Sequence, residues 1–301
     1  MYAKDTAGCH DDVNPTFVGT NKGLTERYER CKNSKVVTLS GFIDVDFFNM
    51  QKYLANGISL TLILTNTSNA FRLLTAEEPT PDYRIEILDY TLIMAHVHPS
   101  PNALLATQEL LSENSLLRYF YIKETFHRYS ITSGVTNFFC ENLFSNSIPQ
   151  RMVIFFMASG AQTSSFKSNP YLFAHYGLTR LALTINGETA PGGIISTNFE
   201  QDDFSEAYST IMRTNPQTLG RGMEVTNGIT AKDYANGNFF VHLNLQPQSF
   251  MGSFFPLKSE GSTRLELRFS SPLPETIIMG VIAYTGSFVE VDYARNVFLA
   301  R

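Results

Sequence analysis

Hydrophobic and polar residues alternate most clearly near the carboxyl end of the chain. Residues 264–269 alternate with a period of two, which places one face of a strand in a core and the other in water. Residues 277–284 are nearly all apolar and predict a strand buried on both faces. Residues 285–287 predict a turn, and residues 288–293 alternate again. This stretch is typical of an antiparallel β meander.

The same alternation recurs along the rest of the chain. Asn186-Gly187 is a strong hairpin signal, whereas residues 189–196 predict a loop. Further strands are predicted at residues 35–48, 58–64, 83–97, 118–130, 135–144, 152–158, 178–185 and 239–245.

Two segments have helical spacing instead. Residues 102–117 carry leucines at helical intervals after a possible N-cap at Asn102, and residues 199–213 repeat apolar residues in the same way. Residues 1–34 are polar and irregular and predict an arm or loop, and residues 214–227 predict a long loop.

A proline-bearing loop at residues 145–150 divides the chain into two halves. We therefore expect a first β-sandwich half over residues 35–148 and a second over residues 149–301, each with one short helix. The predicted fold class is all-β, with two antiparallel sandwich or barrel halves and two short helices.

Composition narrows the function classes. Hydrophobic residues make up 43% and charged residues only 17%, so much of the surface is expected to be covered, for instance by neighbouring copies. The net charge of −5, without any run of Lys or Arg, argues against a nucleic-acid patch. The apolar runs are of strand length and predict no membrane span, and residues 1–20 are too polar for a signal peptide.

Few residues suggest chemistry. Cys9, Cys31 and Cys140 fit neither a disulfide framework nor a zinc site, which predicts free thiols in a reducing compartment. His96 and His98 could face one metal from a single strand, but a third ligand is not evident, and a pair of surface histidines is the simpler interpretation.

The sequence also carries two acidic pairs. Asp44 and Asp46 share one face of a predicted strand and are interpreted as its solvent-facing edge. Asp202-Asp203-Phe204 resembles the acidic motif in capsid proteins of some insect picorna-like viruses, where it is proposed to promote a maturation cleavage. Capping of the predicted helix explains Asp202 and Asp203 equally well and is preferred.

Several stretches together resemble one family, the hexon-like capsid proteins of Maverick (Polinton) elements and adintoviruses, found in invertebrate genomes. The resemblance covers the chain from about Asp5 onward and comes from the order of many short motifs. These are Asn21-Lys22-Gly23-Leu24 with Arg27, Gly41-Phe42-Ile43-Asp44 with Asp46, Lys52-Tyr53-Leu54, residues 58–64, Phe71, Ile148-Pro149-Gln150-Arg151, Asn169-Pro170-Tyr171-Leu172-Phe173, residues 181–187, Ala207-Tyr208, residues 234–240, residues 265–269, and Ile282-Ala283-Tyr284 through residues 292–297.

The resemblance implies a double jelly-roll major capsid protein that forms pseudohexameric homotrimers and tiles an icosahedral shell. Its partners would be neighbouring capsomers and penton or minor capsid proteins, in a virion made in the host cytoplasm or assembled in the nucleus. It implies no catalytic residue, cofactor or metal, so we expect a protein that is not an enzyme.

The chain departs from this family pattern in places. Similar proteins carry a further N-terminal region with the opening strands of the first jelly roll, so we expect residues 35–148 to be incomplete on that side. Asn244-Leu245-Gln246-Pro247-Gln248 replaces an Asp-Leu-Thr-Pro-Asp-like stretch, and Tyr119-Phe120 replaces a Tyr-Pro-like step.

Two alternatives remain open. One is a picorna-like single jelly-roll capsid subunit in which Asp202 and Asp203 aid cleavage. The other is a non-catalytic β-sandwich binding module, whose sugar-binding version is weakened because the chain has no tryptophan.

Overall fold

A computed structural model of the chain describes residues 3–15, 21–43, 45–48, 50, 52–77, 82–113, 116–145, 147–162, 165–213, 228–246 and 259–299. Asp44 of the first acidic pair, the predicted loop at residues 214–227, and Pro247 and Gln248 lie outside the described residues.

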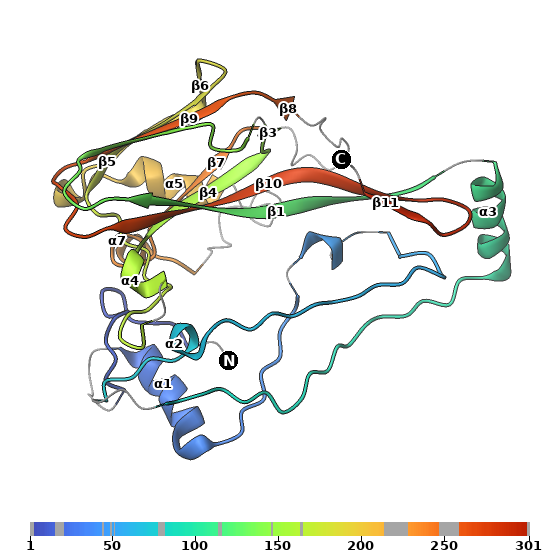
Figure 1. The fold of residues 1–301 in the computed structure, drawn as a ribbon, viewed down its shortest axis with the longest axis horizontal. Helices are drawn as coiled ribbons and strands as arrows, with labels where there is room; N and C mark the ends of the chain where they lie inside the picture. The colour runs from blue at the N-terminus through green and yellow to red at the C-terminus, as the bar shows by residue number, and fades with distance from the viewer. Residues whose placement is uncertain are drawn as a thin grey trace.

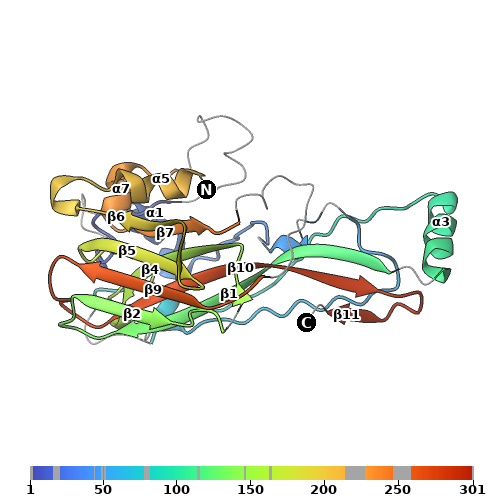
Figure 2. The ribbon, with the colours of Figure 1, turned by 90° about the horizontal axis from the view of Figure 1, so that it is seen from above.

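Eight strands form two facing antiparallel sheets (Figures 1 and 2). The first sheet has the order β1-β10-β4-β7 and the second β2-β9-β5-β6, so the chain crosses repeatedly between the sheets. This arrangement is a jelly roll. The bounds are β1 Leu117–Ile131, β2 Asn137–Glu141, β4 Arg151–Ala158, β5 Leu178–Ile185, β6 Glu188–Ser196, β7 Phe240–Asn244, β9 Thr263–Phe269 and β10 Ile277–Val291. Three short strands are added: β3 (Ser147–Ile148) pairs with β8 (Ser259–Glu260), and β11 (Val297–Leu299) pairs with the end of β10.

The core lies between the two sheets, where the alternating pattern places it. In β9, Leu265 and Leu267 are fully buried while Arg264 and Arg268 are exposed. From the opposite sheet, the Phe156 ring of β4 lies against the Phe269 ring of β9, 5.9 Å between centroids. Burial of these apolar side chains is the main force that holds the sheets together.

The carboxyl-terminal strands differ from the predicted meander. Strands β9 and β10 lie in opposite sheets, because residues 270–276 carry the chain across the sandwich and allow each strand to turn an apolar face inward. The predicted turn at residues 285–287 is also wrong. Strand β10 continues through it because β1 pairs with β10 over its whole length, from Ile277 to Val291.

The predicted loop at residues 189–196 is in fact β6. It pairs with β5 after the hairpin turn at Asn186 and Gly187, both of which have positive φ. The glycine-containing part is accommodated by a register shift between Ala182 and Thr184, so the strand resumes pairing at Ile194.

Both predicted helices exist with shifted ends. Helix α3 (Pro101–Ser112) begins one residue early, because Ser100 rather than Asn102 caps it. Helix α5 (Ser205–Arg213) begins six residues after the predicted start, behind the 3-10 turn η3 (Phe199–Gln201). Figure 2 shows α5 beside β6 and β7, and its buried Ala207 and Ile211 belong to the sandwich core.

The predicted polar arm, residues 1–34, is not wholly irregular. It contains helix α1 (Lys22–Cys31), followed by the turn η1 (Lys32–Ser34). Shorter helices that the patterns did not predict are α2 (Asn69–Arg72), α4 (Ser159–Gln162), α7 (Ala231–Ala235) and the turn η2 (Asp46–Phe48).

Three predicted strands, at residues 35–48, 58–64 and 83–97, are not strands among the described residues. They run extended below the jelly roll in Figure 1, and α3 lies at the far end of this excursion. Their sequences alternate as strands do, but no strand in the described part of the chain supplies hydrogen bonds to them. The jelly roll itself begins at Leu117, upstream of the expected boundary at residue 148.

The all-β class with antiparallel sheets and short helices is thus confirmed, and one jelly roll is complete within residues 117–299. The expected first jelly roll over residues 35–148 stays a prediction, and the part of that range from Leu117 onward belongs to the complete jelly roll instead.

Two substitutions in β9 test where the core lies. Leu267→Ala removes a fully buried side chain from the middle of β9 and should lower the free energy of unfolding by about 2–5 kcal/mol. Arg268→Ala on the same strand removes only an exposed ion pair with Glu266 and should cost about 1 kcal/mol or less. Denaturant titration followed by circular dichroism measures both; equal losses would contradict this placement of the core.

Candidate assembly surfaces

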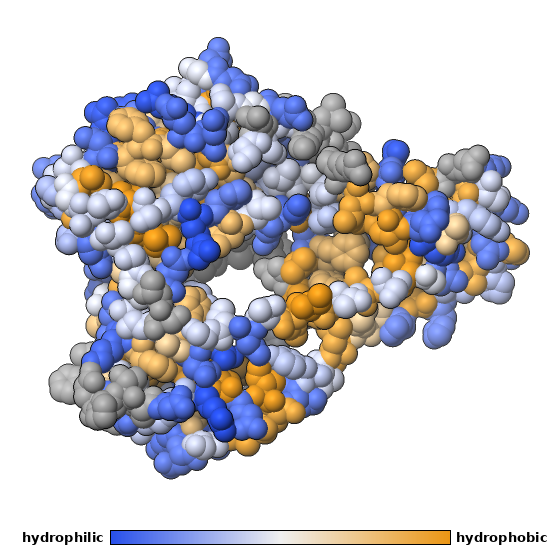
Figure 3. Space-filling model, viewed as in Figure 1, coloured by the Kyte–Doolittle hydropathy of each residue, from blue (hydrophilic) through white to orange (hydrophobic). Residues whose placement is uncertain are grey.

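A large apolar surface lies outside the jelly roll. We call the described residues within 35–67 and 82–99 the open segments. Leu39, Phe42 and Ile93 are about nine-tenths or more exposed, at 89%, 102% and 91%. Figure 3 shows hydrophobic side chains gathered around an opening between the jelly roll and these segments. The remaining exposed large apolar residues are Val36, Val37, Val45, Phe48, Tyr53, Leu60, Leu62, Ile63, Leu64, Tyr83, Ile85, Ile87, Leu88, Tyr90, Leu92, Met94 and Val97.

The backbone of the open segments also lacks hydrogen bonds to other described strands. Across described residues 59–67 and 86–99, no hydrogen bond joins their backbone groups to another strand. One side-chain contact links the two segments: the Tyr90 hydroxyl donates to Asn66 Oδ1 at 3.3 Å. A second contact joins the later segment to α2, where Asn69 Oδ1 accepts from the Ile85 N–H at 3.3 Å. Unpaired strand backbones beside exposed apolar side chains are a template for association.

One end of the open segments is anchored to the projecting ribbon of β1 and β10. There, Tyr119 and Val291 are buried against a small cluster that includes Phe47, Leu54 and Ile58. The Tyr119 hydroxyl accepts a hydrogen bond from the Ala55 N–H at 3.0 Å.

Asp46 belongs to the same anchor. Its Oδ2 accepts a hydrogen bond from the Ile122 N–H, on the side of β1 that faces away from β10. Asp46 therefore supports the fold at a strand edge, rather than pointing to solvent as predicted.

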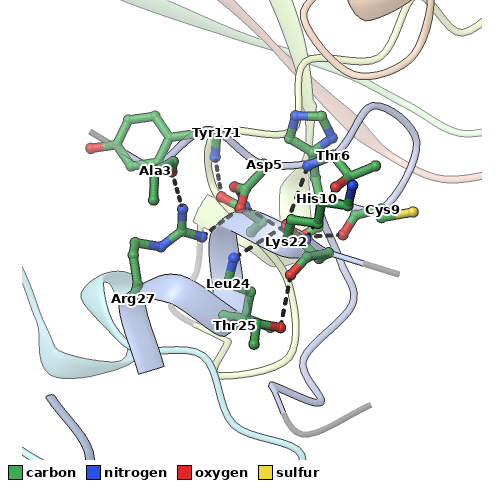
Figure 4. Close-up of polar contacts among 12 residues, drawn as sticks. Ala3, Asp5, Thr6, Cys9, His10, Lys22, Leu24, Thr25, Arg27 and Tyr171 are labelled. Atoms are coloured by element: carbon green, nitrogen blue, oxygen red, sulfur yellow. Dashed lines mark hydrogen bonds and ion pairs between the residues drawn. The ribbon is translucent and has the colours of Figure 1, made fainter. Parts of the chain in front are cut away.

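A second surface is formed by the amino-terminal residues, which fold into a polar cluster (Figure 4). Asn21 caps α1 by accepting from the Leu24 N–H, and its Nδ2 donates to the Cys9 carbonyl at 2.9 Å. Arg27 of α1 forms an ion pair with Asp5 and donates to the Ala3 carbonyl at 2.7 Å. These contacts fold residues 3–10 back along α1.

This cluster is bound to the jelly roll through Asn169, which is only 5% exposed. Its Nδ2 donates to Asp5 Oδ2 at 3.1 Å and to the His10 carbonyl at 3.2 Å, and its backbone N–H donates to Asp11 Oδ1 at 2.6 Å. We call the described residues within 3–31 together with Asn169 the amino-terminal clasp.

The clasp also reaches α7. Lys4 forms an ion pair with Asp233 at 2.6 Å, and the Gly8 N–H donates to the Asn236 carbonyl at 2.8 Å. Burial alone would raise the pKa of Asp233, but hydrogen bonds from Lys4 and Thr230 outweigh it and lower the pKa to about 2.

His10 is the most deeply placed titratable group of the clasp, at 4% exposed. Its ring lies so close to Gly237 that a Cβ there would approach ring atoms to 2.5 Å, and its Nδ1 has no hydrogen-bond partner among the described residues. Burial lowers the pKa of His10 below its ordinary value, opposed by the nearby carboxylates of Asp5, Asp11 and Asp233.

The residues that sequence reasoning considered for chemistry do not come together. His96 and His98 are both exposed in an open segment. Among the described residues, no group of three or more His, Cys, Asp or Glu side chains could hold a metal ion. The three cysteines form no disulfide.

The second acidic pair is exposed in the turn ahead of α5. Asp202 has left-handed backbone conformation, and Asp203 forms an isolated bridge with Asn198. Neither residue lies in the first turn of α5, where Glu206 is the acidic residue instead. The preferred helix-capping interpretation is therefore wrong, because the chain makes a 3-10 turn before the helix begins.

A shallow pocket opens at one end of the jelly roll, lined in part by His175, Asn198, Phe199, Ser270 and Pro274. The His175 ring stacks on Phe199 at 3.8 Å between centroids, and its Nδ1 accepts from the Gly177 N–H. Both interactions fix a turn between strands and give the pocket no evident chemistry. In the part of the chain that the structure describes, no helix has the length and apolar character to cross a membrane.

The sequence patterns did not predict the clasp. Asn21 directly before α1 was a usable capping signal, but its flanking sequence was assigned to a polar arm. The contacts of Asn169 with Asp5 and Asp11 join residues more than 150 positions apart, which no local pattern reveals.

Comparison with known proteins gives a distant relative and weak structural likenesses. No protein-family model matches the chain. Uncharacterized protein F54H12.2 of Caenorhabditis elegans is 21% identical over 304 residues, an alignment that covers 98% of this chain and 71% of the relative.

Among solved structures, the Sputnik virophage gives a TM-score of 0.36 with 11% identity, over 62% of this chain and 38% of that chain. The mavirus major capsid protein gives a TM-score of 0.33 with 7% identity, over 62% of this chain and 41% of that chain. The capsid of the virus PBCV-1 gives a TM-score of 0.33 with 11% identity, over 65% of this chain and 54% of that chain. The chain thus spans well under two thirds of these structures, and nothing about function follows from likenesses this weak.

Asn169→Ala should loosen the clasp without opening the jelly roll. The substitution removes two hydrogen bonds to residues 5 and 10 and should weaken docking by about 1–3 kcal/mol. Hydrogen exchange measured by mass spectrometry should then accelerate in residues 3–31 but not in β4, β9 or β10. Asn137→Ala, on the exposed end of β2, is the matched control and should leave exchange in residues 3–31 unchanged.

The clasp should also loosen in acid. Because His10 has a lowered pKa when docked, the undocked state binds more protons below about pH 6.5, the ordinary value for histidine. Docking should be fully stable above that pH and weaken as pH falls through the docked pKa. After correction for intrinsic exchange rates, residues 3–31 should lose protection between pH 7.5 and pH 5 (about the range in which histidine titrates). His10→Gln should flatten this pH dependence, whereas His96→Gln, at an exposed position, should not. Identical pH profiles for the wild type and both variants would refute the role of His10 in docking the clasp.

Proposed function

We propose that this chain is a structural subunit of a viral capsid: a double jelly-roll major capsid protein that assembles as pseudohexameric trimers into an icosahedral shell. The observation that carries the proposal is the set of open segments, whose strand-like apolar sequences lie exposed beside a complete jelly roll. A single chain with such a surface needs covering polypeptide.

Covering the open segments is favourable in free energy. Fully burying one large apolar side chain is worth about 1.5–3 kcal/mol, and the open segments expose many of them. Pairing of their backbones into strands would add hydrogen bonds that water now supplies. Association is therefore favoured over the isolated chain, and jelly rolls are a recurrent architecture of capsid subunits.

Within this proposal, the open segments belong to the first jelly roll. They contribute too few strands to close an eight-stranded sandwich, so further polypeptide would complete it, in line with the sequence resemblance to hexon-like capsid proteins. The natural partners are neighbouring copies, together with penton or minor capsid proteins, and the location is the virion. The assembly role requires no reaction, and we propose that the chain is not an enzyme.

The alternatives have less support. A picorna-like single jelly-roll subunit would need one barrel over most of the chain, whereas the jelly roll leaves out the described residues before Leu117. Asp202 and Asp203 are exposed in a turn, which gives no special environment for cleavage chemistry. A small binding module would not require so extensive an exposed apolar surface.

Solution mass tests the proposal. Light scattering on the purified chain should give about three copies per particle, the count of a trimeric capsomer, and negative-stain images should show pseudohexagonal outlines. A stable monomer would contradict self-assembly.

Charged substitutions in the open segments sharpen this test. Leu62→Asp combined with Ile93→Asp should shift the mass toward the monomer, because buried charges oppose the contact. Tyr293→Asp changes another exposed apolar residue, on the turn between β10 and β11, and is the control that should keep the wild-type mass. If the double variant associates as the wild type does, the open segments are not the assembly surface.

A further inference from the structure

Strand β1 leaves one side of the first sheet open. It is the outermost strand in the order β1-β10-β4-β7 and pairs only with β10. The Ile122 N–H points away from β10, toward Asp46. Because backbone groups alternate in direction along a strand, those of residues 124, 126 and 128 point to the same open side.

The opposite side of the sandwich is closed. Helix α5 packs on both β7 and β6 there and inserts Ala207 and Ile211 into the core. Beyond the anchor at Asp46, no strand covers the outer side of β1 within the described residues. The side chains of Glu124, Phe126 and Arg128 are all exposed, and Phe126 is 54% exposed.

This stretch is complementary to itself in the antiparallel sense. When two copies of β1 are aligned about Phe126, Glu124 of each copy lies opposite Arg128 of the other. The two Phe126 residues lie opposite each other, and each Phe126 ring stays stacked on Phe155 of its own chain, 6.1 Å between centroids. The alignment brings outward-pointing backbone groups opposite each other, as a hydrogen-bonded antiparallel pair requires. Opposite charges placed directly across a strand pair are stabilising.

Neighbouring alignments lack this match. Those centred on Thr125 or His127 place Glu124 opposite Phe126 or Ser130 and form no pair of opposite charges. A pair centred on Glu124 places two carboxylates opposite each other, and one centred on Arg128 places two guanidinium groups together. Like charges directly opposite each other are destabilising. An alignment centred on Ile122 would displace the hydrogen bond that Asp46 makes to that residue. The charge pattern therefore selects one register and a two-fold relation.

We propose that β1 is an intersubunit edge strand, through which two copies of this chain pair antiparallel about Phe126 and join their first sheets into one continuous sheet. The proposal rests on the proposed function, because the occupant of the edge is a second copy. It adds a specific two-fold contact to the assembly driven by the open segments. The contact is short, so it acts together with other subunit contacts rather than alone.

A charge-exchange experiment tests the proposed pairing. Glu124→Arg and Arg128→Glu each place like charges opposite each other, and each should weaken association by about tenfold or more if the two symmetric pairs together change by at least 1.4 kcal/mol. The doubly exchanged variant, E124R with R128E, restores opposite charges and should recover wild-type association. Sedimentation equilibrium at low salt is the measurement, since salt screens these exposed pairs.

A mixture of the two single variants provides the most direct test of the β1 pairing. One chain then offers Arg at both positions and the other Glu at both, so the mixture should associate more tightly than either variant alone. A folding defect would not be rescued by mixing, and circular dichroism melts check each variant. Glu188→Arg, exposed at the hairpin between β5 and β6, is the control and should behave as the wild type.

The outcomes separate this inference from the proposed function. Normal assembly of both single variants, or absence of rescue on mixing, overturns the β1 contact and leaves the capsid proposal standing. A monomeric wild-type chain overturns both.

Discussion

A strand is stable only when its backbone donors and acceptors find partners, and this constraint divides the chain in two. Strand β10 meets it on both sides, pairing with β1 over its whole length and with β4 along its first part. That double pairing is why residues 285–287 continue the strand despite their turn-like sequence. The open segments have strand-like sequences of the same kind but no partners, and they remain extended and exposed.

The same constraint explains which parts of the fold could be predicted from sequence. The alternation around Leu265 and Leu267 and the hairpin signal at Asn186-Gly187 are local, and both predicted their strands correctly. Sheet membership is not local: β9 and β10 adjoin in sequence yet lie in opposite sheets. At residues 35–48, the pattern indicated strand tendency correctly, but whether a strand forms depends on polypeptide that must lie alongside.

Spacing along the sequence does not show whether candidate chemical residues meet in the folded chain. His96 and His98 are two positions apart, yet no third ligand approaches them in the described structure. Asp46 was expected at a solvent-facing edge but caps the β1 backbone at Ile122. The amino-terminal clasp depends on Asn169 meeting Asp5 and Asp11, contacts that only the folded chain creates. The clasp precedes the open segments and the Asp46 anchor lies within them, and both contact the jelly roll.

The central claim is that the open segments are covered by other polypeptide in an assembled particle. Hydrogen exchange of residues 58–64 and 84–97, compared between assembled particles and dissociated chains, tests it most directly. The account predicts slow, strand-like exchange in the particle and rapid exchange in the dissociated chain, with the jelly-roll strands protected in both. Rapid exchange of these residues in the particle would contradict it.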